Sequence, residues 1–159
     1  MQVKKVIKSQ YGASLAMLRQ AIEKCPDTLW VDAGYVNPFW HVVYHVLFYT
    51  HFYLHPMEGD FVPWLKHRDE ITSLAPSVED EKPFSKEDLL EYLVLCLDQV
   101  DAQVDAMDLE AESGFYWLPF NKLELQFYNI RHIMQHTGEL CERLGSHGEI
   151  EVDWVGMEG

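Results

Sequence analysis

Four stretches of the sequence place apolar residues at the 3.6-residue period of an α-helix, and loops rich in proline, glycine and aspartate separate them. They run from about residue 3 to 25, from 39 to 55, from 86 to 107 and from 122 to 144. No convincing strand and no internal repeat accompany them. The pattern predicts an all-α protein in which four antiparallel helices pack as a four-helix bundle.

The apolar positions also predict which face of each helix is buried. The second helix is apolar on nearly every side, so we expect it to be covered on most faces. The predicted buried stripes of the other helices are Tyr11, Leu15, Leu18, Ile22 and Cys25; Leu89, Leu93, Cys96, Val100, Val104 and Met107; and Leu123, Phe127, Ile130, Met134, Thr137, Cys141 and Leu144.

Local signals mark where the helices begin and end. Capping residues precede three of the helices, and a glycine suited to a left-handed stop follows the fourth. These signals are Asn37 with Pro38 at the second start, Ser85 with Asp88 and a Phe84–Leu89 staple at the third, Asn121 with Glu124 at the fourth, and Gly145 as the stop.

One long connection, from residue 56 to 83, joins the second and third helices and is expected to contain a short helix near residues 64–74. A connection of this length is usually functional or crosses the bundle. The apolar tail around Trp154 is expected to fold back toward the helices.

Length and composition indicate one compact domain covering residues 1–159. The chain is 48% hydrophobic, which is too rich for a disordered protein, yet no stretch is long and apolar enough to span a membrane. The first residues lack a secretory pattern, so we predict a cytoplasmic protein. Cys25, Cys96 and Cys141 are widely spaced and lie on apolar stripes, which favours reduced core thiols.

The formal net charge is −14, from 26 acidic and 12 basic residues. Such a charge, without a basic stripe, would repel a phosphate backbone, so no nucleic-acid partner is expected. It says little about the charge of a substrate, because one bound metal ion can reverse the potential inside a cleft.

Six of the eight histidines form pairs spaced four residues apart: His41 and His45, His51 and His55, and His132 and His136. On a helix this spacing puts two imidazoles on one face, about 5–6 Å apart at Cβ, so both can reach one ion. The pair at 132 and 136 lies beside a core-forming stripe, where unpartnered imidazoles would cost about 1–3 kcal/mol each. Gly138 indicates either a close approach by another group or simple packing clearance. A third ligand must then come from elsewhere, and His41 and His45 are both candidates.

Three segments carry a resemblance to a known family: Asn37-Pro-Phe-Trp-His-Val-Val-Tyr-His, Arg131-His-Ile-Met-Gln-His-Thr-Gly-Glu-Leu and the closing Val152-Asp-Trp-Val-Gly. Together they resemble the DinB/YfiT-like metalloenzyme family, whose members are up-down-down-up four-helix bundles. In that family one histidine of the second helix and a His-x-x-x-His pair of the fourth bind the metal. The resemblance implies His45, five positions after Trp40, together with His132 and His136.

The remaining histidines receive other roles. His41 is expected on the surface or lining a cleft, with a role as a fourth or outer ligand left open. His51 and His55 lie too far along the helix to reach the same ion and are expected to stabilise its C-terminus.

Three imidazoles with open positions suit Lewis-acid chemistry and favour zinc or nickel, with iron or manganese as alternatives. Gln135, Glu139 and Asn129 are within helical reach to orient the ligands. Three functions stay open: a metal-dependent hydrolase, a thiol S-transferase or isomerase of the bacillithiol or mycothiol type, and a non-catalytic stress protein. We expect an unidentified small-molecule substrate and, from the resemblance, a homodimer; the sequence identifies no catalytic base.

Overall fold

The computed structural model describes residues 2–75, 78 and 81–158. It is all-helical, with no strand in these ranges. The α-helices are α1 (Gln2–Lys24), α2 (Asp27–Trp30), α3 (Phe39–Leu54), α4 (Lys86–Ala106) and α5 (Lys122–Gly148); two short 3₁₀ helices, η1 (Glu58–Asp60) and η2 (Asp69–Ile71), lie between α3 and α4. The sequence did not predict α2.

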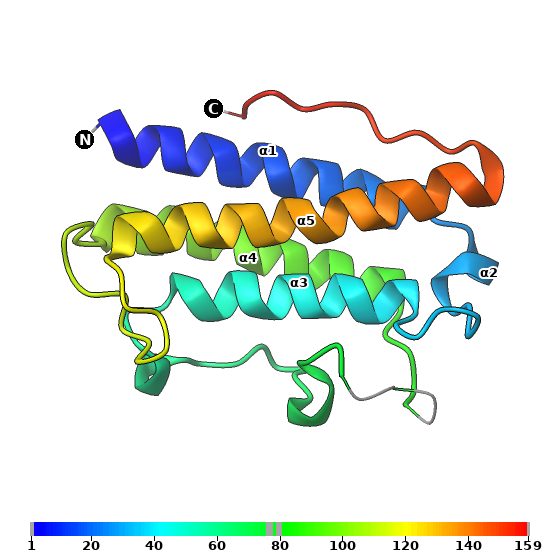
Figure 1. The fold of residues 1–159 in the computed structure, drawn as a ribbon, viewed down its shortest axis with the longest axis horizontal. Coiled ribbons are helices and arrows are strands. Elements are labelled where there is room, and N and C mark those ends of the chain that lie inside the picture. The colour runs from blue at the N-terminus through cyan, green and yellow to red at the C-terminus, as the bar shows by residue number, and fades with distance from the viewer. Residues whose placement is uncertain (1, 76–77, 79–80, 159) are drawn as a thin grey trace.

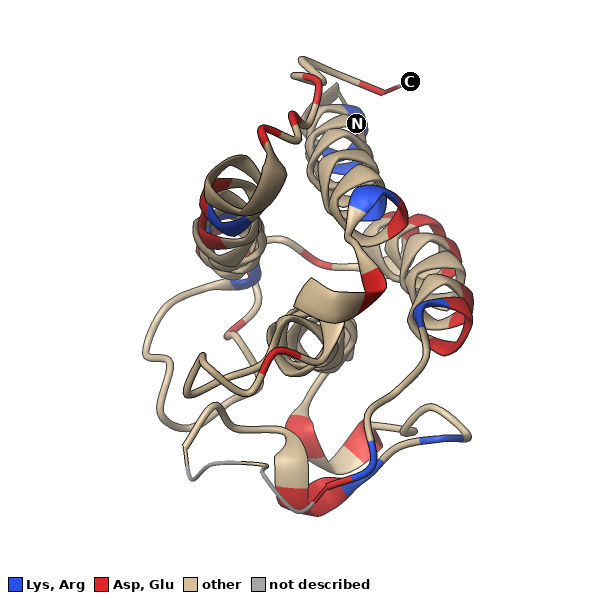
Figure 2. Ribbon diagram, turned by 90° about the vertical axis from the view of Figure 1, so that its right-hand side faces the viewer, with Lys and Arg blue, Asp and Glu red and all other residues tan. Residues whose placement is uncertain are grey.

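The four long helices lie side by side (Figure 1). Helix α1 packs against α4 and α5, and α3 packs against the same two helices on the other side. In Figure 1, α1 and α5 run in one direction, while α3 and α4 run in the opposite one. Figure 2 looks along the helices and shows acidic residues on α4, on the side that faces away from the other helices. Each long helix therefore buries the face that it turns toward its two neighbours.

Helix α3 is the most deeply buried helix, as its uniformly apolar sequence predicts. Thirteen of its 16 residues are buried, and the three others, His45, Tyr49 and Phe52, form a stripe at spacings of four and three. That spacing puts them on one side of the helix. The only partly exposed side of α3 therefore carries a histidine.

The local capping signals account for the starts of α4 and α5. Ser85 accepts from the Asp88 backbone N–H while the Asp88 carboxylate accepts from Ser85, which forms the predicted capping box. Asn121 caps α5 by accepting from the Glu124 N–H.

Three boundary predictions are wrong. Pro38, not Asn37, occupies the cap position of α3, and no side chain caps that end. Helix α5 continues through Gly145 to Gly148 and ends because Glu149 adopts the left-handed conformation, with φ at 57°. The short helix expected at 64–74 is only the single turn η2.

The buried stripe of α5 also differs from the prediction. Phe127 is 64% exposed, whereas Leu125, Gln126 and Asn129 are fully buried. The helix is rotated so that polar side chains enter the core, where partners on distant helices bond to them: Tyr11 donates to Gln126, and Asn129 donates to the Thr50 carbonyl. Apolar periodicity alone cannot register such partners.

Residues 149–158 return along α1, as predicted for the tail (Figure 1). Asp153 N–H donates to the Gln20 side chain, and Glu158 N–H donates to the Ser9 carbonyl. Trp154 nevertheless stays 77% exposed, so backbone and polar contacts hold the tail rather than burial of its tryptophan. Among the described helices, none combines the length and apolar character that crossing a bilayer would require.

Candidate metal centre

The three histidines singled out by the sequence meet between α3 and α5. His45, His132 and His136 each offer one ring nitrogen, and these nitrogens all lie within 4.8 Å of one another. The Nε2 atoms of His45 and His132 are 3.0 Å apart. The three ring centres are separated by 4.8 to 5.0 Å. Residues separated by 87 positions in the chain are thus brought to one point by the packing of α3 on α5.

Outer hydrogen bonds determine which nitrogen faces the centre of this cluster. His45 Nδ1 lies 2.7 Å from the Thr72 carbonyl oxygen, and His136 Nδ1 lies 3.1 Å from the Glu139 carboxylate. Both oxygens only accept, so each Nδ1 must carry its hydrogen. When such a ring is neutral, its Nε2 atom is a lone pair, which is the form that binds a metal ion.

His132 lacks such an outer partner. Its Nδ1 is buried and has no hydrogen-bond partner within the described part of the chain. Burial and the two neighbouring imidazoles lower the pKa of His132 to about 3, and burial lowers the pKa of His45 to about 4. Both rings are consequently neutral at pH 7.

This geometry fits one transition-metal ion. Two nitrogens bound tetrahedrally to zinc at about 2.0–2.1 Å lie about 3.3 Å apart, close to the 3.0 Å between His45 and His132 Nε2. Three imidazole nitrogen donors suit zinc, nickel, copper or iron better than calcium or magnesium, which prefer oxygen. The three nitrogens lie within 4.8 Å of one another, so the three side chains form a group that could hold one ion.

The surroundings combine one aromatic ring with one ion pair. Tyr49, one helical turn after His45, packs its ring 4.9 Å from that of His45 and 5.8 Å from that of His132. On the other side, Glu139 also accepts from Arg143, whose guanidinium in turn donates to the Asn37 carbonyl. Glu139 is thus held in place from behind while it orients His136.

A comparison with protein families decides the relationship. The model of the DinB superfamily matches residues 10–140, which include all three histidines. This chain belongs to the DinB superfamily. No curated protein and no solved structure matches it. The resemblance stated from the sequence is therefore confirmed, and the cluster gives this superfamily member a group that could hold a divalent metal ion.

The residues predicted to lie around the ligands differ in their observed positions. Glu139 orients a histidine as anticipated, but Gln135 is exposed and Asn129 bonds to Thr50 instead. Gly138 is exposed with open space where a Cβ would lie, so neither a close approach nor packing clearance explains it.

The predicted surface position of His41 is wrong. His41 is fully buried, and its Nε2 donates to the Ile71 carbonyl at 2.9 Å. Its Nδ1 is buried without a partner among the residues that the structure describes. His41 therefore binds the connecting segment rather than lining a cleft.

Sequence reasoning missed two contributors to the cluster. Tyr49 could have been found from its spacing, because a residue four positions after a helical ligand lies on the same face. The Thr72 carbonyl could not, because a backbone oxygen leaves no mark on the sequence.

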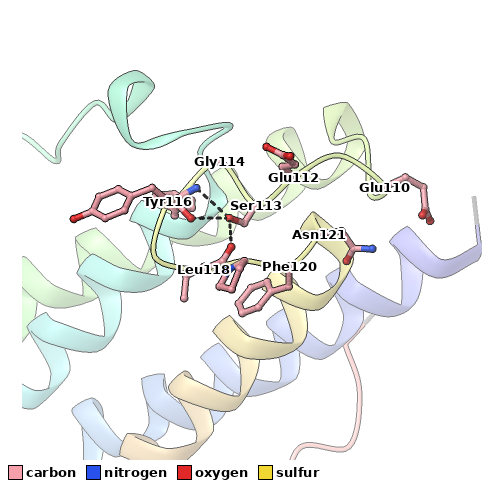
Figure 3. Close-up of a pocket in the computed structure, with 10 residues that line it drawn as sticks. Glu110, Glu112, Ser113, Gly114, Tyr116, Leu118, Phe120 and Asn121 are labelled. Carbon is pink, nitrogen blue, oxygen red and sulfur yellow. Dashed lines mark hydrogen bonds between the residues drawn. The ribbon is translucent and has the colours of Figure 1, made fainter.

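A separate pocket of about 580 Å³ lies in the loop before α5 and shares no residue with the histidine cluster (Figure 3). The Ser113 hydroxyl lies at the centre of this loop, donating to the Leu118 carbonyl and accepting from Phe115 N–H. Gly114, at a φ of 89°, passes against Pro56 so closely that any Cβ would collide with its carbonyl oxygen. These contacts build the loop, and they leave Ser113 committed to backbone partners.

Proposed function

We propose that this chain is a metal-dependent enzyme, a hydrolase in the first instance, built as an up-down-down-up four-helix bundle. A divalent ion, zinc or nickel before iron or manganese, would be held by His45, His132 and His136. One observation carries the proposal: two of the three imidazoles have their tautomers fixed by outer acceptors at Nδ1, and the three rings offer nitrogens within 4.8 Å of one another. Such outer partners are a usual feature of histidines that bind a metal ion.

A bound ion would supply Lewis acidity, polarising a carbonyl or lowering the pKa of a bound water toward about 7. The chain itself supplies orientation. The Thr72 carbonyl and Glu139 hold two ligand rings, and Tyr49 places an apolar ring beside the cluster. Because His45 and His132 are partly exposed, a small molecule can approach from the side of α3 that carries them.

The second candidate is a thiol S-transferase or isomerase. It is favoured because the one carboxylate bonded to the cluster already has other partners and is not free to act as a base. Within the described residues, Glu139 is the only carboxylate hydrogen-bonded to His45, His132 or His136, and it is already engaged by His136 and Arg143. A hydrolase usually needs a free carboxylate or histidine as base, whereas a thiol that coordinates a metal loses its proton without one. The third candidate, an ion that only fastens α3 to α5 in a stress protein, would need no substrate at all.

The test is metal analysis and activity on the purified protein, with His136→Ala as the variant and His147→Ala as the matched control. His147 lies on the same helix but is exposed. The parent and the control are expected to hold about one equivalent of tightly bound metal, and His136→Ala is expected to lose most of it. Equal metal in parent and His136→Ala would contradict the proposal.

Activity then separates the candidates. Metal-dependent ester or amide hydrolysis supports the hydrolase, and metal-dependent transfer of a low-molecular-weight thiol to an electrophile supports the transferase. A large fall in melting temperature on chelation, with neither activity, supports the structural ion. The homodimer, the small-molecule substrate and the lack of a nucleic-acid partner stay predictions from the sequence.

A further inference from the structure

A second pair of buried histidines lies at the end of α3, outside the cluster described above. His51 is 3% exposed and His55 is 6% exposed. They are spaced one helical turn apart, and their ring centres are 4.9 Å apart, within the 4.8 to 5.0 Å that separates the rings of the first cluster. Two imidazoles are rarely buried together unless their nitrogens have partners.

Only half of these nitrogens have partners. His55 Nδ1 donates to the His51 carbonyl at 2.9 Å, so its Nε2 is a lone pair in the neutral ring. His51 Nδ1 lies 3.2 Å from the Tyr92 hydroxyl, which can accept or donate. Neither Nε2 has a hydrogen-bond partner in the described ranges of the chain. Both rings therefore keep one nitrogen available.

These two rings line a pocket of about 320 Å³ between α3, the connecting segment and α4. Its mouth carries Val62 and Leu65, which are 70% and 95% exposed, so the pocket is reached from solvent. Simple packing would be served better by leucine at both positions, because leucine fills a core without polar atoms to satisfy. The placement of two histidines on a solvent-reached pocket is what needs an explanation.

We propose that His51 and His55 form a second site for a divalent late first-row transition-metal ion, with both Nε2 atoms as ligands and water completing the shell. Imidazole pairs one helical turn apart bind such ions, and affinity rises along the series toward copper. The Tyr92 hydroxyl can accept from His51 Nδ1 and so hold the ring in the ligand tautomer.

This site is distinct from the first. His51 follows His45 by six residues, which places it about 9 Å further along the helix and about 120° around its axis. The pair consequently faces α4, whereas His45 faces α5. Glu91 lines the same pocket, but its carboxylate is paired with Lys66. Because no third ligand atom joins the two rings within 4.8 Å among the described residues, the second ion should bind more weakly than the first.

The test uses the full chain and Cu²⁺ as the probe. Asparagine is the matched replacement, because its side-chain amide reaches roughly where Nδ1 lies but offers nothing at Nε2. His55→Asn can still donate to the His51 carbonyl, and His51→Asn can still bond to Tyr92. The exposed His147→Asn controls for adventitious binding by a surface histidine. Calorimetry counts the equivalents, and electron paramagnetic resonance reports nitrogen ligands on the weaker one.

The parent and His147→Asn are expected to bind a tight and a weaker equivalent of Cu²⁺, the weaker one with two nitrogen ligands. Each of His51→Asn and His55→Asn should lose the weaker equivalent and keep the tight one. The far-ultraviolet circular dichroism spectrum of each variant should match that of the parent, which shows that the helices are intact. Keeping both equivalents in either variant would overturn the proposal, as would equal loss in His147→Asn. If His136→Ala removes the tight equivalent and leaves the weaker one, the two sites are independent. If the proposed three-histidine site does not bind metal at all, the parent should still show the weaker equivalent alone.

Discussion

Glu139 provides a sharp test of how the histidine cluster is oriented. Its Oε2 accepts from His136 Nδ1 at 3.1 Å, while its Oε1 accepts from Arg143. Glu139→Gln keeps the size and an accepting oxygen but removes the negative charge. A charge-assisted hydrogen bond is roughly twice as strong as a neutral one, so the substitution should weaken the orienting bond without abolishing it.

The expected loss is moderate. Replacing an outer partner of a metal-bound histidine typically lowers metal affinity about 10–100-fold. Glu139 is 41% exposed, so solvent already screens its charge, and the amide oxygen of the replacement side chain would still accept. We therefore expect the lower end, about tenfold, which corresponds to about 1.4 kcal/mol. Competition against a chromophoric zinc chelator measures it directly.

Glu142→Gln is the control. It removes the same charge from the same helix three positions away, where Glu142 is exposed and accepts from Ser146. Affinity in this variant should stay within about twofold of the parent, since exposed charges at a distance are largely screened. Equal losses in both variants would show that Glu139 acts only through long-range charge. No loss in either would show that it does not orient His136.

Three further predictions concern stability. Ser85→Ala removes the capping box of α4 and should lower the free energy of unfolding by about 1 kcal/mol in denaturant titration, with Ser85→Thr recovering most of it. Gln126→Leu removes the Gln126 acceptor of the buried Tyr11 hydroxyl and should cost about 1–3 kcal/mol; adding Tyr11→Phe should recover part of that loss, and an additive double mutant would refute the pairing. Burial lowers the pKa of His41 below its ordinary value of 6.5, so the unfolded chain takes up its proton first and the metal-free protein should lose stability as pH falls below about 6.5. His41→Gln, which can still donate to the Ile71 carbonyl, should show a shallower loss between pH 6.5 and 4, and an unchanged slope would count against this role for His41.

The parts of the structure that the sequence predicted are those decided by local chemistry. The capping box at Ser85 and the cap at Asn121 act within four residues, so their signals are complete in the sequence. The burial of α3 follows equally directly from its composition. His45, His132 and His136 were selected by spacing together with a family resemblance, because spacing alone left His41 and His45 equivalent.

The parts that failed depend on distant partners. The rotation of α5 is determined by polar side chains whose partners lie 79 to 115 positions away, such as Thr50 for Asn129 and Tyr11 for Gln126. A polar residue with a distant partner looks like a surface residue in the sequence, so the predicted buried stripe included Phe127 and left out Asn129. The end of α5 was also predicted wrongly. Gly145 has open space where a Cβ would lie, and a helix can continue through a glycine in such a position instead of ending there.

The long connection between α3 and α4 helps to orient the histidine cluster through its backbone carbonyls. Two histidines one turn apart on α3 bind two consecutive carbonyls at the end of η2: His41 Nε2 donates to Ile71, and His45 Nδ1 donates to Thr72. His41 thus fastens the segment whose next carbonyl orients His45. This explains why His41 is buried although it lies outside the candidate metal-binding group: it positions the acceptor that fixes the tautomer of a candidate ligand. Three ligand side chains on two helices would still leave the ring of His45 free to turn, and the connecting segment supplies the constraint that the helices alone do not.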